Sequence, residues 1–228
     1  MNTITLQPTW RGSLSHGWDT MKKYFLPLLL VVIVLGIVDA PMQMVEDFFR
    51  SDEPHSRSNF QILLEITAFA YWLLFVPVIG YGADLLFVQS VRGERINVKN
   101  IIIGFNDYFT IILANILASA LVGIALIALI IPGIIVACRL AFVSYLVMDK
   151  NLDPVAAVEG SWKLTRGHGW KIFALSITSI FIFIGGFLLV FVGALPAIMW
   201  IKSSFASLYE AALQETDEST FMPADRAE

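Results

Sequence analysis

Long apolar stretches alternate with short polar segments along the whole chain. A helix needs about 20 apolar residues to cross about 30 Å of hydrocarbon, because it rises about 1.5 Å per residue. Six stretches are long enough or nearly so, and they cover residues 24–44, 62–91, 107–131, 134–149, 171–193 and 197–213. The pattern predicts an all-α fold, a polytopic integral membrane helix bundle of about six transmembrane helices.

Proline and glycine interrupt this pattern at three places. The stretch 62–91 is longer than one span requires, and we expect Pro77 and Gly80 to kink or break it. Pro132-Gly133 joins the third and fourth stretches, and residues 193–196 join the fifth and sixth. Such residues suit tight turns, so the last four stretches are predicted to form two hairpins.

Three polar segments have the periodicity of amphipathic helices. They cover about 8–22, 97–105 and 153–166. In the last of these, Asp153 suits the N-cap, Pro154 the first turn and Gly167 the C-terminal end. We predict that all three lie in the membrane plane, on the cytoplasmic side, with their apolar faces in the acyl boundary.

Each amphipathic segment precedes two apolar stretches, which indicates three repeated units of one in-plane helix and one membrane hairpin. Three degenerate copies also arise by chance in so apolar a chain, so the repeat is a hypothesis. We interpret 1–214 as a single membrane domain, and 215–228 as an acidic, disordered tail.

Composition agrees with a membrane protein. Apolar residues make up 57% of the chain and charged residues only 15%, whereas a soluble domain carries about 25% charged residues. Cys138 is the only cysteine, so an intramolecular disulfide is excluded.

Basic residues are distributed unevenly between the polar segments. Three precede the first stretch, three lie between the second and third, and four lie between the fourth and fifth, but only two lie between the first and second. Because lysine and arginine favour the cytoplasmic side, both termini are predicted to be cytoplasmic. The first stretch also resembles a signal peptide, but Pro41 would then begin the mature chain. We therefore expect an uncleaved first span.

The most distinctive sequence combines Pro132-Gly133, the stretch Leu146–Lys150 and the segment Gly160–Gly167. It resembles the membrane-domain family fused to some bacterial glycerophosphoryl diester phosphodiesterases, and the YciC-like inner-membrane proteins of unknown function. The resemblance is specific over about 130–175. It implies a bacterial multi-pass inner-membrane protein. It does not imply phosphodiesterase activity, which in the fused proteins belongs to a separate soluble barrel domain.

Four charged residues inside the apolar stretches are the best candidates for chemistry: Asp84, Arg139, Lys202 and Glu210. A charge at a helix centre costs about 2.5–3.5 kcal/mol on insertion scales, so such side chains face the bundle or a water cavity. Asp84 and Arg139 are predicted at similar depth and therefore as a pair, while Lys202 and Glu210 share one helix face. The resulting polar network either forms a path for an ion, headgroup or solute, or is structural.

A second set of candidates belongs to the in-plane helices. Tryptophan and basic side chains there are predicted to contact anionic headgroups, and these are Trp18, Lys22, Lys23, Trp162, Lys163 and Arg166. The binding partners expected are therefore the lipid bilayer and, in addition, either anionic lipid or another membrane protein. The oligomeric state is open.

Motifs for catalysis, cofactors, metals and nucleic acids are not found in the sequence. His16, His55 and His168 lie far apart and lack metal-ligand spacing. We therefore predict no enzyme, no catalytic residue, no cofactor and no metal. The leading interpretation is a membrane-organising, lipid-contacting or partner-binding protein. The alternative is a small transporter, channel or lipid carrier that uses the intramembrane charges.

Overall fold

The structure is a computed structural model of the chain, and it describes residues 9–50, 59–188 and 193–216. Helices make up almost all of this part of the chain, and it contains no strand. The predicted all-α fold is confirmed. The helices are α1 (Trp10–Lys23), α2 (Phe25–Arg50), α3 (Asn59–Leu74), α4 (Val76–Val91), the 3-10 helix η1 (Val98–Asp107), α5 (Tyr108–Ala128), α6 (Ile130–Arg139), α7 (Val143–Lys150), α8 (Pro154–Leu164), α9 (Gly169–Leu188) and α10 (Ala194–Glu215).

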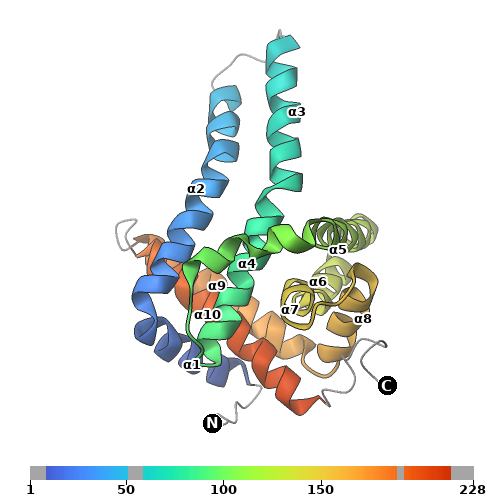
Figure 1. Cartoon of the computed structure of the whole chain (residues 1–228). Helices are drawn as coiled ribbons and strands as arrows, with labels where there is room; N and C mark the ends of the chain where they lie inside the picture. The colour runs from blue at the N-terminus through green and yellow to red at the C-terminus, as the bar shows by residue number, and fades with distance from the viewer. Residues whose placement is uncertain (1–8, 51–58, 189–192, 217–228) are drawn as a thin grey trace.

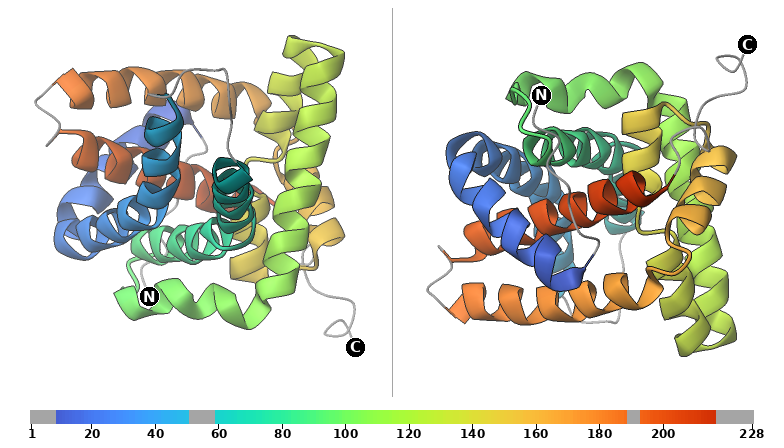
Figure 2. Two further views of the ribbon diagram at one scale, coloured as in Figure 1. Left: turned by 90° about the horizontal axis from the view of Figure 1, so that it is seen from above. Right: turned by 90° about the horizontal axis from the view of Figure 1, so that it is seen from below.

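The order of the helices follows the three predicted units. The short helices α1, η1 and α8 each precede a long helix, namely α2, α5 and α9. The chain then returns through α3 and α4, through α6 and α7, or through α10. The α2–α3 hairpin rises out of the molecule, whereas α5 is seen almost end-on in the same view (Figure 1). From above and below, α5 and α9 run in different directions, so the hairpins point three ways from a common base (Figure 2).

Each short helix packs on the return helix of the preceding unit. η1 packs on α4, α8 packs on α7, and α1 packs on α10, which closes the ring between the first and last units. Glycine permits two of these contacts. A Cβ on Gly17 would lie 2.7 Å from the Ser204 backbone nitrogen, and one on Gly104 would lie 2.7 Å from the Val78 carbonyl oxygen. These distances are too short for any larger residue, so the glycines are needed for packing.

The core lies around the ends of the return helices. α4 and α10 each bury eleven residues. Phe142, Tyr145 and Tyr209 pack together there, with the Tyr145 and Tyr209 rings stacked at 5.1 Å between centroids. By contrast, α3 buries no residue. The molecule is thus a packed base from which apolar helices project.

Five helical segments are long and apolar enough to span a membrane: Phe25–Met44, Asn59–Val91, Val98–Ala128, Ile130–Lys150 and Gly169–Leu188. They overlap the first five predicted stretches, so the protein has the helices of a membrane protein. The sixth stretch, 197–213, lies within α10, which is not among the five. Composition explains this, because Lys202, Glu210 and three serines lower the mean hydropathy of α10.

Two predicted interruptions have different outcomes. The break in 62–91 is confirmed, since α3 ends at Leu74 and α4 begins at Val76, with Pro77 in its first turn. The prediction of a turn at Pro132-Gly133 is wrong. The chain turns at Leu129, which is extended, and both residues lie in the first turn of α6. Proline lacks the amide hydrogen that a first turn leaves unused, so it favours this position.

Residues 193–196 also begin a helix rather than forming a turn of their own, since α10 starts at Ala194. Three predictions lie partly or wholly outside the described residues. These are the end of the 8–22 helix before Thr9, the segment between α2 and α3, and the tail beyond Thr216. α10 ends at Glu215, within one residue of the predicted domain boundary.

Candidate functional site

The fourth apolar stretch is not one helix, and its break shapes the whole site. α6 ends at Arg139, and α7 begins only at Val143. Ser161 of α8 bridges the gap, because its hydroxyl donates to the Arg139 carbonyl oxygen (2.7 Å) and accepts from the Phe142 amide (3.2 Å). Thr165, one turn later, lies 3.3 Å from the same carbonyl. These side chains satisfy backbone groups that a helix break leaves without partners.

The first charge pair joins α4 and α10. Lys202 donates to Asp84 at 2.7 Å, and the Ser144 hydroxyl of α7 donates to the other carboxylate oxygen at 2.8 Å. Asp84 is buried, with 8% of its surface exposed. The predicted Asp84–Arg139 pair is therefore wrong. That prediction assumed a continuous helix over 134–149, whereas the break after Arg139 turns the following segment into a separate helix.

The second charge cluster lies about two turns further along α4 and α10, at Arg92 and Glu210. Arg92, the C-cap residue of α4, makes a bidentate pair with Asp149 of α7, and its Nη2 lies 2.8 Å from Oδ2. Its Nε donates to Glu210 at 2.8 Å, and the Tyr209 hydroxyl donates to Asp149 at 2.9 Å. Burial lowers the pKa of the Arg92 guanidinium, but the two carboxylates outweigh it and raise that pKa above its ordinary value.

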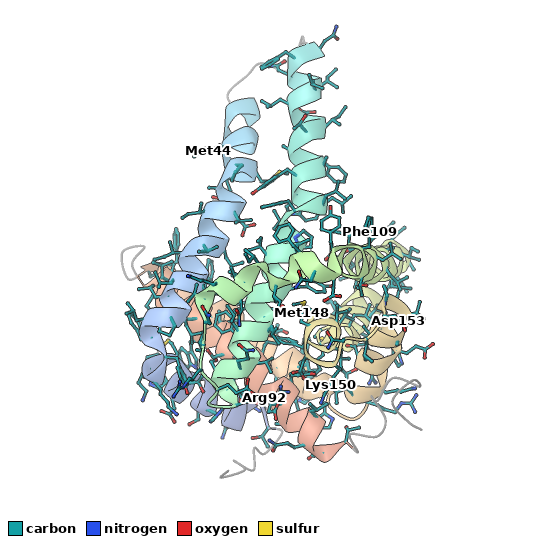
Figure 3. The ribbon with its side chains drawn as sticks, viewed as in Figure 1. Met44, Arg92, Phe109, Met148, Lys150 and Asp153 are labelled. Carbon is teal, nitrogen blue, oxygen red and sulfur yellow. The ribbon has the colours of Figure 1, made fainter. Side chains whose placement is uncertain are left out.

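Sequence reasoning missed Arg92 and Asp149, because both fall at the ends of apolar stretches and look like loop charges. A signal was present. Asp84 and Arg92 are eight residues apart with opposite signs, as are Lys202 and Glu210, and the partners are separated by 118 residues in both pairs. Equal separations mean that α4 and α10 run parallel. Figure 3 places Arg92 and Lys150 in the base, away from Met44 on the α2–α3 hairpin.

Arg139 stands apart from both clusters. Its guanidinium lies over the Trp162 ring, 5.8 Å from the centroid. Its Nη1 is buried without a hydrogen-bond partner, and no carboxylate in the described part of the chain forms an ion pair with it. Of the four predicted network residues, Asp84, Lys202 and Glu210 thus face the α4–α10 contact, and Arg139 does not.

Arg139 lies at a groove of about 430 Å³ between α6 and the start of α9. Apart from the arginine the walls are apolar or glycine, and the lining residues are Ile131, Ile134, Ile135, Cys138, Arg139, Gly169, Trp170 and Phe173. Trp170 is 76% exposed at this edge. The arrangement offers one cation and an adjoining apolar channel to a ligand from outside the chain.

The six predicted headgroup contacts are all exposed, but they form two groups. On α1, Trp18 is 41% exposed and packs on Trp200 of α10 with 4.7 Å between centroids. Lys22 lies over the Trp18 ring and pairs with Asp19 at 2.9 Å, and Lys23 lies over Tyr24. On α8 and just beyond it, the exposed group is Trp162, Lys163 and Arg166. Both helices are visible on the face seen from below (Figure 2).

The predicted N-terminal end of α8 is confirmed, whereas the helix ends at Leu164, two residues before the predicted end, with Thr165 as its C-cap. The Asp153 side chain accepts from the amides of Val155 and Ala156, Pro154 opens the helix, and Gly167 has a positive φ of 84°. Within the described ranges, no group of three or more His, Cys, Asp or Glu side chains is placed to hold a metal ion.

Comparison with known proteins finds no family model, no curated protein and no solved structure that matches this chain.

Proposed function

We propose that this protein is a non-enzymatic membrane protein that gathers anionic lipid at one face of the bilayer. The observation that carries the proposal is which side chains α1 and α8 bury and which they expose. Each helix buries its small residues against a return helix and exposes tryptophan next to basic side chains. A helix held in this way presents a fixed amphipathic surface at the base of the hairpins.

The chemistry of the exposed residues fits a headgroup layer. Tryptophan favours the membrane–water interface, where its ring is in apolar surroundings and its N–H reaches polar groups. Lysine and arginine near an anionic leaflet contribute about 1 kcal/mol each. Four such cations, Lys22, Lys23, Lys163 and Arg166, flank the two exposed tryptophans. Asp19 offsets part of the charge of Lys22.

The membrane and orientation belong to the same proposal. The excess of basic residues before the first hairpin and between later ones supports cytoplasmic termini and an inner face that carries α1, η1 and α8. The resemblance to bacterial inner-membrane families supports a bacterial inner membrane as the location. In that setting the exposed base would meet the anionic cytoplasmic leaflet.

The test is the lipid composition around the purified protein. We would reconstitute it in nanodiscs of equal phosphatidylglycerol and phosphatidylcholine, then measure the ratio of the two lipids that stay with the protein on transfer to detergent. We expect enrichment of phosphatidylglycerol that falls when all four cations are changed to glutamine. The matched control exchanges lysine and arginine at the same positions, which keeps the charge. Equal ratios for wild type and the glutamine variant would refute the proposal.

Transport through the intramembrane charges is the less favoured function. Asp84, Lys202 and Glu210 are paired within the chain, and the groove at Arg139 lies elsewhere. Proton flux into vesicles, followed with an enclosed pH-sensitive dye, separates the two proposals. A flux that Asp84→Asn abolishes without unfolding the protein would favour transport.

A further inference from the structure

We infer that the groove between α6 and α9 is a site for one anionic phospholipid, with the phosphate on Arg139 and an acyl chain along the isoleucines. This inference rests on the proposed function, since it names one site within a protein that gathers anionic lipid. It also goes further, because it requires a single bound lipid with defined contacts rather than general enrichment.

The charge of Arg139 is the first argument. Two other basic residues in the apolar stretches or at their ends have carboxylate partners: Lys202 has Asp84, and Arg92 has Asp149 and Glu210. Arg139 has none among the described residues, and its Nη1 is both buried and without a hydrogen bond. A buried guanidinium nitrogen without an acceptor is unfavourable. A phosphate supplies both the acceptor and the opposite charge, and arginine binds it in a bidentate manner.

The shape of the groove is the second argument. Its volume of about 430 Å³ falls in the range of about 300–1,000 Å³ that is typical of small-molecule sites. Ile131, Ile134 and Ile135 line it away from the arginine, along the exposed side of α6. The cation and the apolar wall are therefore arranged in the order of a headgroup and its acyl chain.

The position of Arg139 is the third argument. Its carbonyl oxygen is bonded to Ser161, and its guanidinium covers Trp162, so the end of α6 is fixed to α8. Because α8 is proposed to lie at the headgroup layer, Arg139 lies there too. Trp170 flanks the groove at the same end and is largely exposed. A phosphate in that layer reaches Arg139 without leaving its normal depth.

The experiment is native mass spectrometry of the protein released from nanodiscs of phosphatidylglycerol and phosphatidylcholine. Two variants act on the two halves of the site. Arg139→Gln removes the cation, and Gly169→Leu fills the groove, since a Cβ at Gly169 meets no atom within 4 Å. Each has a matched control. Arg95→Gln removes an exposed arginine outside the groove, and Gly185→Leu adds a side chain on the same helix, where a Cβ also meets no atom within 4 Å.

We expect wild type and both controls to retain one phosphatidylglycerol under conditions that strip the other lipids. Retention of phosphatidylglycerol should fall about tenfold to hundredfold in Arg139→Gln, which loses a charge-assisted hydrogen bond. A fall of similar size is expected in Gly169→Leu, because the leucine side chain occupies the space of the lipid. Arg139→Lys should recover part of the retention. Gly169→Leu keeps the test decisive if Arg139→Gln fails to fold. Inorganic phosphate should leave the lipid in place, since the acyl chain contributes to binding.

Several outcomes would overturn the inference. They are equal retention of phosphatidylcholine, retention unchanged in both site variants, displacement by inorganic phosphate alone, and a retained mass equal to a second copy of the chain. If general enrichment of phosphatidylglycerol persists while no single lipid is retained, the site is refuted and the proposed function stands. If no enrichment occurs at all, both fail.

Discussion

The α4–α7–α10 core and the α6–α9 groove differ in whether their basic side chains have carboxylate partners. In the core, Arg92 lies between two carboxylates and Lys202 lies against Asp84. At the groove, Arg139 has a tryptophan ring beside it and no acid in the described chain. Arginine therefore has two roles in this protein. A charge that carboxylates of the chain neutralise holds helices together, whereas a charge without such a partner attracts a ligand from outside the chain. Charge number alone does not distinguish these roles.

Removing the charge of Arg92 should have the largest effect on stability. Arg92→Met leaves Asp149 and Glu210 buried without their cation, and breaking a buried pair in this way costs about 3–5 kcal/mol. The measurement is the free energy of unfolding in mild detergent with added denaturant. Arg95→Met, at an exposed position in the same segment, should change it by less than about 0.5 kcal/mol. Equal effects at both positions would contradict the core role.

Ser161→Ala tests how the groove is joined to the core. The change leaves the Phe142 amide without its partner and removes the shorter of the two hydrogen bonds to the Arg139 carbonyl, which should cost about 1–3 kcal/mol in the free energy of unfolding. Ser176→Ala is the matched control, because the Ser176 hydroxyl bonds only a carbonyl of its own helix. An equal loss at Ser176 would show that the break between α6 and α7 does not depend on α8.

A double-mutant cycle sharpens the assignment of Asp84. Asp84→Asn and Lys202→Gln should be non-additive, with a coupling energy of about 1 kcal/mol, reduced because the Lys202 side chain is 35% exposed. Asp84→Asn and Arg139→Gln should be additive within about 0.5 kcal/mol. The reverse pattern, with coupling to Arg139 and none to Lys202, would restore the pairing expected from the sequence.

The smallest effect on stability is expected for Arg139→Gln in detergent without lipid. The change removes a cation–π contact of about 0.5–1 kcal/mol and also an unpartnered buried nitrogen, so the net shift should be within about 0.5 kcal/mol. Thermal unfolding of the delipidated protein measures it. A loss as large as that for Arg92→Met would mean that Arg139 is a structural residue like Arg92.

Local signals predicted the helices well, and contacts between distant segments decided the rest. Asp153 and Pro154 mark the start of α8 because N-terminal capping depends only on the neighbouring backbone. The apolar runs predicted the projecting hairpins because a run of apolar residues is also a local property of the sequence. The break after Arg139 depends on Ser161, 22 residues away, and nothing in the apolar run indicates it. Since depth was estimated along an unbroken helix, the partner of Asp84 was assigned wrongly.

The ring between the first and last units has a consequence for synthesis. α1 docks on α10, and the Trp200 indole donates to the Leu14 carbonyl across 186 residues of sequence. At about 5–20 residues per second, roughly 10–40 s pass between translation of these two segments. During that time the face of α1 that includes Gly17 has no α10 to pack on. Of the described helices, α1 is thus translated first and is among the last to reach its final position.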